Sequence, residues 1–232
     1  YTGTAVKPEI ISFTVKRLGK TVTITDFDNL DITYSSNSDV GTGKITITAL
    51  EGEGFTGSVS KTFTIVGASV ENAVVRVENG VYTGEEVEPS YVVTLGGRTL
   101  VSGKDFRADF SNNVNATDSA VLTITGINNY SGTNSARFTI SPRRITDADI
   151  TVAAARYTGQ SLTPALTVKI GGTTLVQDVD FTAEYSDNVN VTDDETKASV
   201  KVTGIGNYTG NASEEFEISP RDISLASVAD MD

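Results

Sequence analysis

Carboxylates are the side chains of this sequence best suited to chemistry, because it contains neither His nor Cys. They form four short clusters: Asp26, Asp28 and Asp31; Asp147 and Asp149; Asp178 and Asp180; and Asp193, Asp194 and Glu195. Such clusters could hold a calcium ion, supply the acid and base of a glycosidase, or simply be hydrated surface. No segment fits the twelve-residue calcium loop, whose central Gly and terminal Glu are missing. We therefore expect no catalytic, cofactor-binding or metal-binding residues, with calcium as the alternative cofactor.

The residue types that are absent exclude several classes of function. Without His there is no imidazole base for a catalytic triad, and without Cys there is no thiolate nucleophile. The net charge of −12 disfavours nucleic acid, whose phosphates attract Lys and Arg. No apolar run approaches the ~20 residues of a membrane-spanning helix. We predict a protein that is not an enzyme, binds no nucleic acid and does not insert into a membrane.

A glycine-rich motif at Gly52–Gly57 matches the GxGxxG fingerprint of nucleotide-binding proteins. That fingerprint requires a following helix, whose N-terminus binds the pyrophosphate. The residues that follow, 58–65, alternate like a strand. We interpret the motif as a turn.

The 8 Tyr and 9 Phe residues all recur at equivalent positions of three segments. The equivalent sets are Tyr1, Tyr82 and Tyr157; Phe13 and Tyr91; Phe27, Phe106 and Phe181; Tyr34, Phe110 and Tyr185; Phe55, Tyr130 and Tyr208; and Phe63, Phe138 and Phe216. Aromatic residues repeated in register are typical of core and corner positions. None is left over for stacking on sugar rings, so a carbohydrate-binding accessory module is kept only as an alternative function.

Three copies of one unit make up the sequence, and no flexible linker separates them. Each copy opens with Tyr-Thr-Gly and closes with Phe-x-Ile. We predict β modules at residues 1–67, 68–142 and 143–220, called repeat 1, repeat 2 and repeat 3, with 221–232 starting a further repeat or a linker. Repeat 1 lacks the strand that should precede Tyr1, so we expect it to be N-terminally incomplete and the chain to be cut from a longer array. Short joints also predict a monomeric, elongated rod.

The residue choice predicts an all-β fold. The chain has 33 Thr and 26 Val against 10 Leu, and β-branched side chains favour strands. Gly96-Gly97 and Gly171-Gly172 lie where two-residue hairpin turns need positive φ. No amphipathic helix of useful length is evident. We predict a tandem array of small, Ig-like β-sandwich modules, with a β-grasp-like module as the other candidate.

The order of motifs resembles a known repeat family. Tyr-Thr-Gly, Pro, Gly-Gly-x-Thr-Leu, Asp-Phe, Gly-x-x-Asn-Tyr-x-Gly and Phe-x-Ile follow one another as in the tandem β modules of cell-wall and secreted proteins of Gram-positive bacteria. The likeness covers the whole chain, but repeat 1 departs from it at Ala49–Phe55. The resemblance implies an extracellular place on the bacterial surface, no catalysis, and a role as adhesin or stalk. It implies no universal ligand residues, so the partner-binding residues are unknown.

Two functions compete. One is adhesion to a host extracellular protein, such as an immunoglobulin or a mucin-type glycoprotein; the other is a purely structural stalk that spaces another domain from the cell wall. The segments Phe27–Phe55, Phe106–Tyr130 and Phe181–Tyr208 differ in length, and variable loops often carry recognition. This difference favours adhesion, through polar loops or by pairing along an exposed strand edge.

Overall fold

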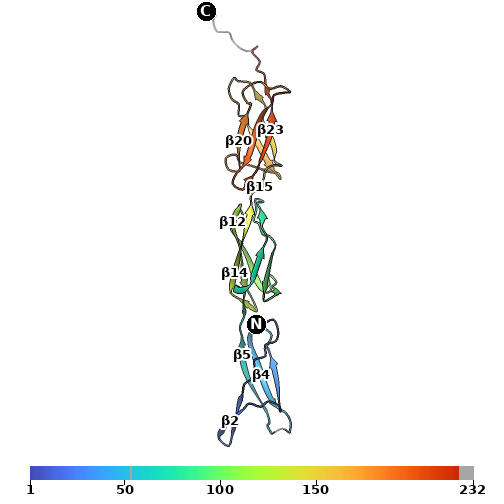
Figure 1. Cartoon of the computed structure of the whole chain (residues 1–232), viewed down its shortest axis with the longest axis vertical. Coiled ribbons are helices and arrows are strands. Elements are labelled where there is room, and N and C mark those ends of the chain that lie inside the picture. Colours follow the sequence, from blue (N-terminus) through green and yellow to red (C-terminus); the bar gives the residue numbers. More distant parts are fainter. Residues whose placement is uncertain (53, 225–232) are drawn as a thin grey trace, which may run out of the picture. The chain divides into compact units, whose positions relative to one another are not determined.

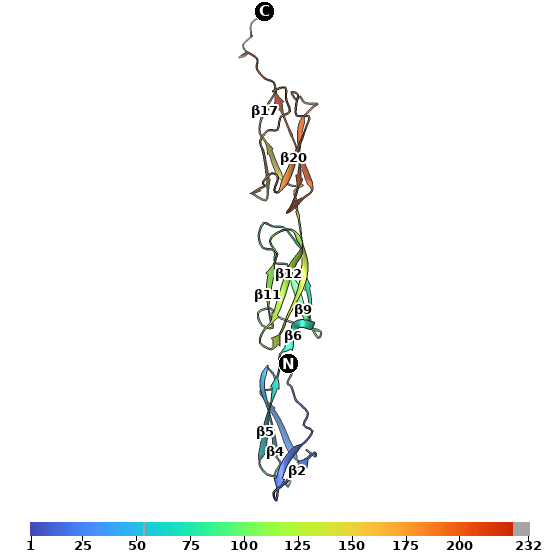
Figure 2. The same cartoon turned by 90° about the vertical axis from the view of Figure 1, so that its left-hand side faces the viewer.

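The computed structural model describes residues 1–52 and 54–224, in which strands are the regular structure (Figure 1). The only helical segment in this part of the chain is a 3₁₀ turn, η1 (Val70–Asn72), which follows β6 (Figure 2). Ser69 caps this turn by accepting a hydrogen bond from the backbone N–H of Glu71. The sheets contain two to four strands each. The prediction of an all-β chain built from small sheets is confirmed.

Two compact units make up the chain. The first consists of Tyr1–Val77, Ser90–Phe110 and Leu122–Ala136, and the second of Glu78–Pro89, Ser111–Val121 and Arg137–Asp232. The first unit thus holds repeat 1 with part of repeat 2, and the second holds the rest of repeat 2 with repeat 3. The predicted repeat boundaries stay a prediction, and residues 225–232 of the predicted fourth segment lie outside the described residues.

Repeat 1, in the first unit, contains two small antiparallel sheets. One is the hairpin of β1 (Phe13–Arg17) and β2 (Lys20–Ile24). The other has the order β3-β4-β5 and consists of β3 (Leu30–Ser35), β4 (Gly41–Ala49) and β5 (Ser58–Ile65). Because β5 begins directly after the glycine-rich motif, the strand expected there is confirmed.

Repeat 2 is divided between the units. Its strands are β6 (Ala68–Ser69), β7 (Val74–Val77), β8 (Gly80–Val81), β9 (Tyr91–Leu95), β10 (Arg98–Thr99), β11 (Phe106–Ser111), β12 (Thr117–Gly126), β13 (Tyr130–Ser131) and β14 (Thr133–Ser141). They form sheets in the orders β10-β9-β7 and β11-β12-β14-β8, and β6 pairs with β13 in parallel.

Repeat 3, in the second unit, has the same succession of strands, except that two strands, β23 and β24, take the place of β14. They are β15 (Arg143–Arg144), β16 (Asp149–Val152), β17 (Ala155–Arg156), β18 (Leu166–Ile170), β19 (Thr173–Thr174), β20 (Phe181–Ser186), β21 (Ala198–Gly204), β22 (Tyr208–Thr209), β23 (Asn211–Phe216) and β24 (Ile218–Ser219). The sheets have the orders β16-β18-β19 and β20-β21-β23, and the parallel pairs are β15-β22 and β17-β24.

The hairpin turns predicted from paired glycines are present. Gly96 and Gly97 have φ of 56° and 81° between β9 and β10, and Gly171 and Gly172 have φ of 56° and 85° between β18 and β19. Glycine adopts these left-handed conformations at no steric cost, which is why it closes two-residue turns. Both predicted turns are confirmed.

Each unit has an apolar core supplied by two facing sheets. In the first unit Val93 of β9 shares a cluster with Phe106 of β11 and Ile124 of β12. In the second unit Val168 of β18 shares a cluster with Phe181 of β20 and Val202 of β21. Burial alternates along β11 and β20, as expected for strands with one face on a core. This packing of sheet on sheet is a β-sandwich.

Candidate functional site

The carboxylate clusters organise their own loops. Asp193 Oδ1 accepts hydrogen bonds from Thr196 Oγ1 at 2.7 Å and from the backbone N–H groups of Thr196 and Glu195 at 2.8 and 2.9 Å. These bonds, with the Thr196 side chain first, lower the pKa of Asp193. Within residues 1–52 and 54–224, no three or more Asp or Glu side chains are grouped closely enough to hold a metal ion. The expected lack of a cofactor, with calcium as the alternative, stays a prediction.

Two other carboxylates recur at one corner of repeats 2 and 3. Asp105 Oδ2 accepts from the backbone N–H of Val101 at 2.9 Å, and Asp180 Oδ2 accepts from that of Val176 at 2.8 Å. Asp26, their predicted counterpart, accepts instead from the backbone N–H of Asp28. The corner therefore differs in repeat 1.

The predicted equivalence of Phe27 with Phe106 and Phe181 is wrong. Leu30 begins β3 opposite Ala49, just as Phe181 begins β20 opposite Gly204. Tyr34 and Tyr185 each follow four residues later on the same face. Phe27 lies before β3, in the connection from β2, and so does not occupy this strand position. Leu30, which is half-buried, occupies it in repeat 1.

Most of the aromatic residues in repeats 2 and 3 lie in or against a core, as predicted. Tyr130 is 6% exposed and Tyr208 is 7% exposed. Two aromatic side chains depart from that prediction: Phe55, the counterpart of these tyrosines in repeat 1, is 37% exposed, and Tyr157 is 36% exposed.

A joint connects repeats 1 and 2 inside the first unit. The ring of Tyr1 packs edge-to-face on that of Tyr130, with centroids 5.4 Å apart. Asn129 Oδ1 accepts from the backbone N–H of Val40 at 2.8 Å, and Asn129 Nδ2 donates to Asp39 Oδ1 at 2.8 Å. One aromatic contact and one bridging amide thus hold the two repeats together.

The second unit contains the same joint between repeats 2 and 3. Tyr82 packs edge-to-face on Tyr208, with centroids again 5.4 Å apart. Asn207 Oδ1 accepts from the backbone N–H of Ala116 at 2.8 Å, and Asn207 Nδ2 donates to Asn115 Oδ1 at 3.0 Å. The Asn-Tyr motif contains both residues that form the joint, the bridging asparagine and the packed tyrosine, but the sequence analysis did not predict this role. The recurrence of Asn directly before the buried Tyr is the sequence feature that could have indicated it.

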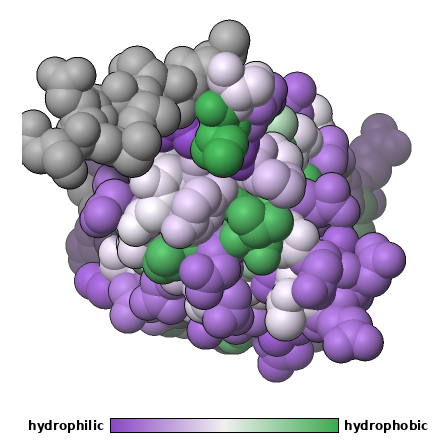
Figure 3. All heavy atoms as spheres, turned by 90° about the horizontal axis from the view of Figure 1, so that it is seen from above, coloured by the Kyte–Doolittle hydropathy of each residue, from purple (hydrophilic) through white to green (hydrophobic). Residues whose placement is uncertain are grey.

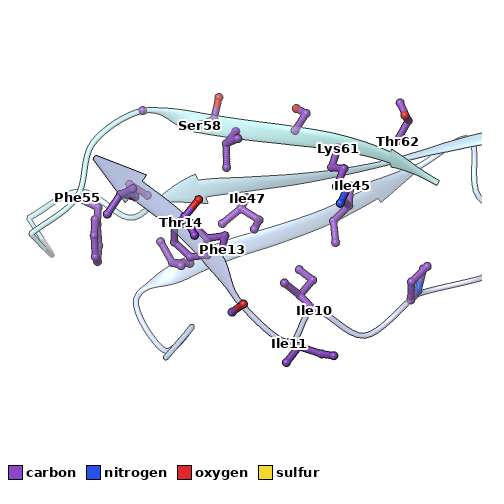
Figure 4. A pocket seen from close by; sticks show the side chains of 18 of the residues that line it. Ile10, Ile11, Phe13, Thr14, Ile45, Ile47, Phe55, Ser58, Lys61 and Thr62 are labelled. Carbon is purple, nitrogen blue, oxygen red and sulfur yellow. The ribbon is translucent and has the colours of Figure 1, made fainter. Parts of the chain in front are cut away.

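Repeat 1 contains a groove of about 800 Å³ between β1 and the β4–β5 pair (Figure 4). Ile10 and Ile11 come from the segment before β1, Phe13 and Thr14 from β1 itself, and Ile45 and Ile47 from β4 (Figure 4). Further apolar lining residues include Val15, Leu30, Phe55 and Val59. The lining is therefore mainly apolar, and β5 adds polar residues to it, among them Ser58, Lys61 and Thr62 (Figure 4).

The groove is open because β1 has only one strand partner in the described part of the chain. In the first unit β9 pairs with β10 on one edge and with β7 on the other. In the second unit β18 likewise lies between β19 and β16. Their counterpart β1 pairs with β2 alone. An unpaired edge beside an apolar groove is chemically suited to accepting one more strand.

The surface elsewhere is mainly hydrophilic where it can be seen. Figure 3 shows one face of the molecule, on which hydrophobic side chains form small separate groups among hydrophilic ones. None of the helical segments found in residues 1–52 and 54–224 is long and apolar enough to cross a lipid bilayer.

Comparison with known proteins gives no family. The sequence matches no protein-family model and no curated protein. The resemblance to Gram-positive surface modules stays a prediction.

Proposed function

We propose that this chain is a non-catalytic spacer of a bacterial surface protein, in which built joints fix each repeat to the next. The observation that carries the proposal is the recurrence of one joint, with the same edge-to-face tyrosine pair at 5.4 Å and the same bridging asparagine. The motif resemblance supports a place on the cell surface.

A joint of this kind resists bending because it has two separate anchor points. An edge-to-face aromatic pair contributes about 0.5–1.5 kcal/mol, and each hydrogen bond contributes a similar amount. The connection is also short: β14 ends at Ser141 and β15 begins at Arg143, so that only Pro142 lies between them. A connection of one residue is too short to act as a flexible linker between the two repeats.

Small-angle X-ray scattering tests the spacer. A compact chain of this length would have a radius of gyration of about 17 Å. The proposal expects a clearly larger radius with a narrow distance distribution, and a broader distribution for the double variant Asn129→Ala/Asn207→Ala. The exposed Asn211→Ala variant is the matched control and should scatter like the unmodified chain. A radius near the compact value would overturn the spacer.

Adhesion to a host protein is the second candidate. It is favoured by the connection between β20 and β21, residues 187–197, which is longer than the 112–116 connection between β11 and β12. Its acidic turn, Asp193–Glu195, is exposed and is held in shape by the Asp193 hydrogen bonds. An ordered, exposed, acidic loop that distinguishes one repeat from the others is suited to recognition.

Retention of the chain on immobilised immunoglobulin and on mucin tests adhesion. The candidate expects retention that falls when Asp194 and Glu195 are both replaced by Ser, and that survives enzymatic removal of glycans from the target. Loss of retention after deglycosylation would favour the carbohydrate-binding alternative. No retention on either protein would leave the spacer role alone.

A further inference from the structure

In repeats 2 and 3 the segment that leads into the repeat pairs directly with the strand that ends it. We call residues 68–81 and 143–156 the entry segments, and β14 and β24 the last strands. In repeat 2 the entry segment contributes β8, which pairs in parallel with β14. In repeat 3 it contributes β17, which pairs in parallel with β24. Each repeat thus has a direct connection between the part where the chain enters and the part where it leaves.

A parallel pair of this kind responds to tension in a particular way. Its two strands point in the same direction, so a force that pulls the entry segment toward the N-terminus and the last strand toward the C-terminus slides one strand along the other. The hydrogen bonds between parallel strands are evenly spaced, so they bear such a force together rather than breaking one after another. The contacts that join an entry segment to its last strand therefore determine how much tension a repeat withstands.

Asn79 strengthens this connection in repeat 2. Its Oδ1 atom accepts a hydrogen bond from the backbone N–H of Thr139 at 2.9 Å. Asn79 directly precedes β8, and Thr139 directly precedes Ile140, where the pairing of β14 with β8 begins. The side chain thus extends the strand pair by one hydrogen bond. Repeat 3 has Ala154 at the position of Asn79, and an alanine side chain cannot accept a hydrogen bond.

Asn134 joins the entry segment of repeat 2 to β14 at a second place. It belongs to β14, and its Nδ2 atom lies within 3.2 Å of the carbonyl oxygens of Val70, Glu71 and Ala73, which belong to the entry segment. Repeat 3 has Ala212 at the position of Asn134, so it cannot form these hydrogen bonds. Both asparagine links between entry segment and last strand are therefore specific to repeat 2.

The last strand is continuous in repeat 2 and divided in repeat 3. β14 runs from Thr133 to Ser141 and lies between β12 and β8 in a four-stranded sheet. In repeat 3, β23 ends at Phe216 and β24 begins at Ile218, and β24 forms a two-stranded sheet with β17. Ile218 is held on its other side by two hydrogen bonds with Thr192, a loop residue. A force on the end of repeat 3 therefore acts on a short strand pair outside the sheet β20-β21-β23.

We propose that repeat 2 is a load-bearing repeat, and that repeat 3 unfolds before it when the chain is pulled along its length. The proposal rests on the spacer role, because a spacer between two attachment points is under tension whenever these points are drawn apart. It goes beyond that role by assigning different functions to two repeats with the same fold. Repeat 3 absorbs tension by unfolding, which lengthens the chain by roughly 200 Å, while repeat 2 keeps its structure.

Constant-force measurements on single molecules of the full chain test the proposal, because forced unfolding is governed by the unfolding rate. A cysteine added at each end provides the attachment, since the sequence has none. Asn79→Ala removes a link of repeat 2 and should raise the rate of one unfolding step about fivefold, the factor expected for one hydrogen bond. Ala154→Asn offers the same acceptor to the backbone N–H of Glu217, the counterpart of Thr139, and should slow an earlier step by a similar factor.

Asn113→Ala is the matched control within repeat 2. Asn113 is 5% exposed, and its Nδ2 atom donates to the carbonyl oxygen of Val87, so this hydrogen bond joins neither the entry segment nor β14. Its loss should cost more stability in chemical denaturation than the loss of the exposed Asn79, yet change the unfolding rate under force less. If the two variants rank in the same order in both measurements, Asn79 contributes only general stability and the proposal is overturned.

The order of the unfolding steps separates this proposal from the spacer role. The step that Ala154→Asn slows should precede the step that Asn79→Ala speeds up. The reverse order, or no change in either step, would overturn the load-bearing role of repeat 2 even for a chain that small-angle scattering shows to be extended. A compact radius of gyration would instead overturn the spacer itself, and with it the use of a load-bearing repeat.

Discussion

At the scale of single residues, Asn134 illustrates how one polar side chain binds the backbone of the segment that begins repeat 2. Its Nδ2 atom lies 3.2, 3.1 and 2.8 Å from the carbonyl oxygens of Val70, Glu71 and Ala73. The Asn134→Ala variant leaves these carbonyls without that donor, so we expect it to lower the free energy of unfolding by about 1–2 kcal/mol. Chemical denaturation followed by circular dichroism measures the change.

The control for this substitution is Asn211→Ala on an exposed position of repeat 3. Repeat 3 carries Ala212 where repeat 2 carries Asn134, so the contact is specific to repeat 2. The control should stay within the ~0.5 kcal/mol typical of surface substitutions. An equally small effect of Asn134→Ala would show that its contacts contribute nothing measurable.

Asp193 makes one loop of repeat 3 sensitive to acid. Because its pKa is lowered by hydrogen bonds from Thr196 and Glu195, its ionised form stabilises the folded loop. That stabilisation is complete above the unfolded pKa of about 4 and is lost as the pH falls through the lower, folded pKa. A carboxyl titration by NMR should therefore place Asp193 below unperturbed aspartates.

The Thr196→Ala variant checks the cause of that shift. Removing the hydroxyl should raise the pKa of Asp193 toward its ordinary value, whereas Thr167→Ala on an exposed face of β18 should leave it unchanged. An Asp193 that titrates normally in the unmodified chain would contradict the prediction.

At the scale of strands, β1 should exchange its amide hydrogens faster than its counterparts. β9 and β18 have partners on both edges, and β1 has one. The comparison with β18 is well matched, because Phe13–Arg17 reads FTVKR and Leu166–Ile170 reads LTVKI. Hydrogen–deuterium exchange at low protein concentration should show protection of β18 well above that of β1. Equal protection would mean that the edge of β1 is covered.

Local sequence predicted the strands and turns well. Alternating Val, Ile and Thr define the strands because one face of each is buried, and paired glycines define the hairpins because they need positive φ. Both patterns are local, so they can be recognised in the sequence without knowing which strand is the partner.

What depends on pairing between distant segments was not predicted. The Asp-Phe motif suggested Phe27 for the first position of this strand, but the register of β3 against β4 places Leu30 there instead. The bridging role of Asn129 and Asn207 depends on a neighbouring repeat. The groove depends on the strand pairing of β1, which has one partner in the described part of the chain where β9 and β18 have two.

At the scale of the whole molecule, the tyrosine at each joint gives the chain a direction under mechanical load. Tyr1 packs against the core of repeat 2, and Tyr82 packs against the core of repeat 3, so each core is closed by a side chain from the repeat before it. When a pulling force unfolds one repeat, the next repeat toward the C-terminus loses the tyrosine that covers its core. The repeat on the N-terminal side keeps the contacts of its core. Rupture should then spread toward the C-terminus more easily than toward the N-terminus, so that a break beginning in repeat 3 would spare the repeats before it.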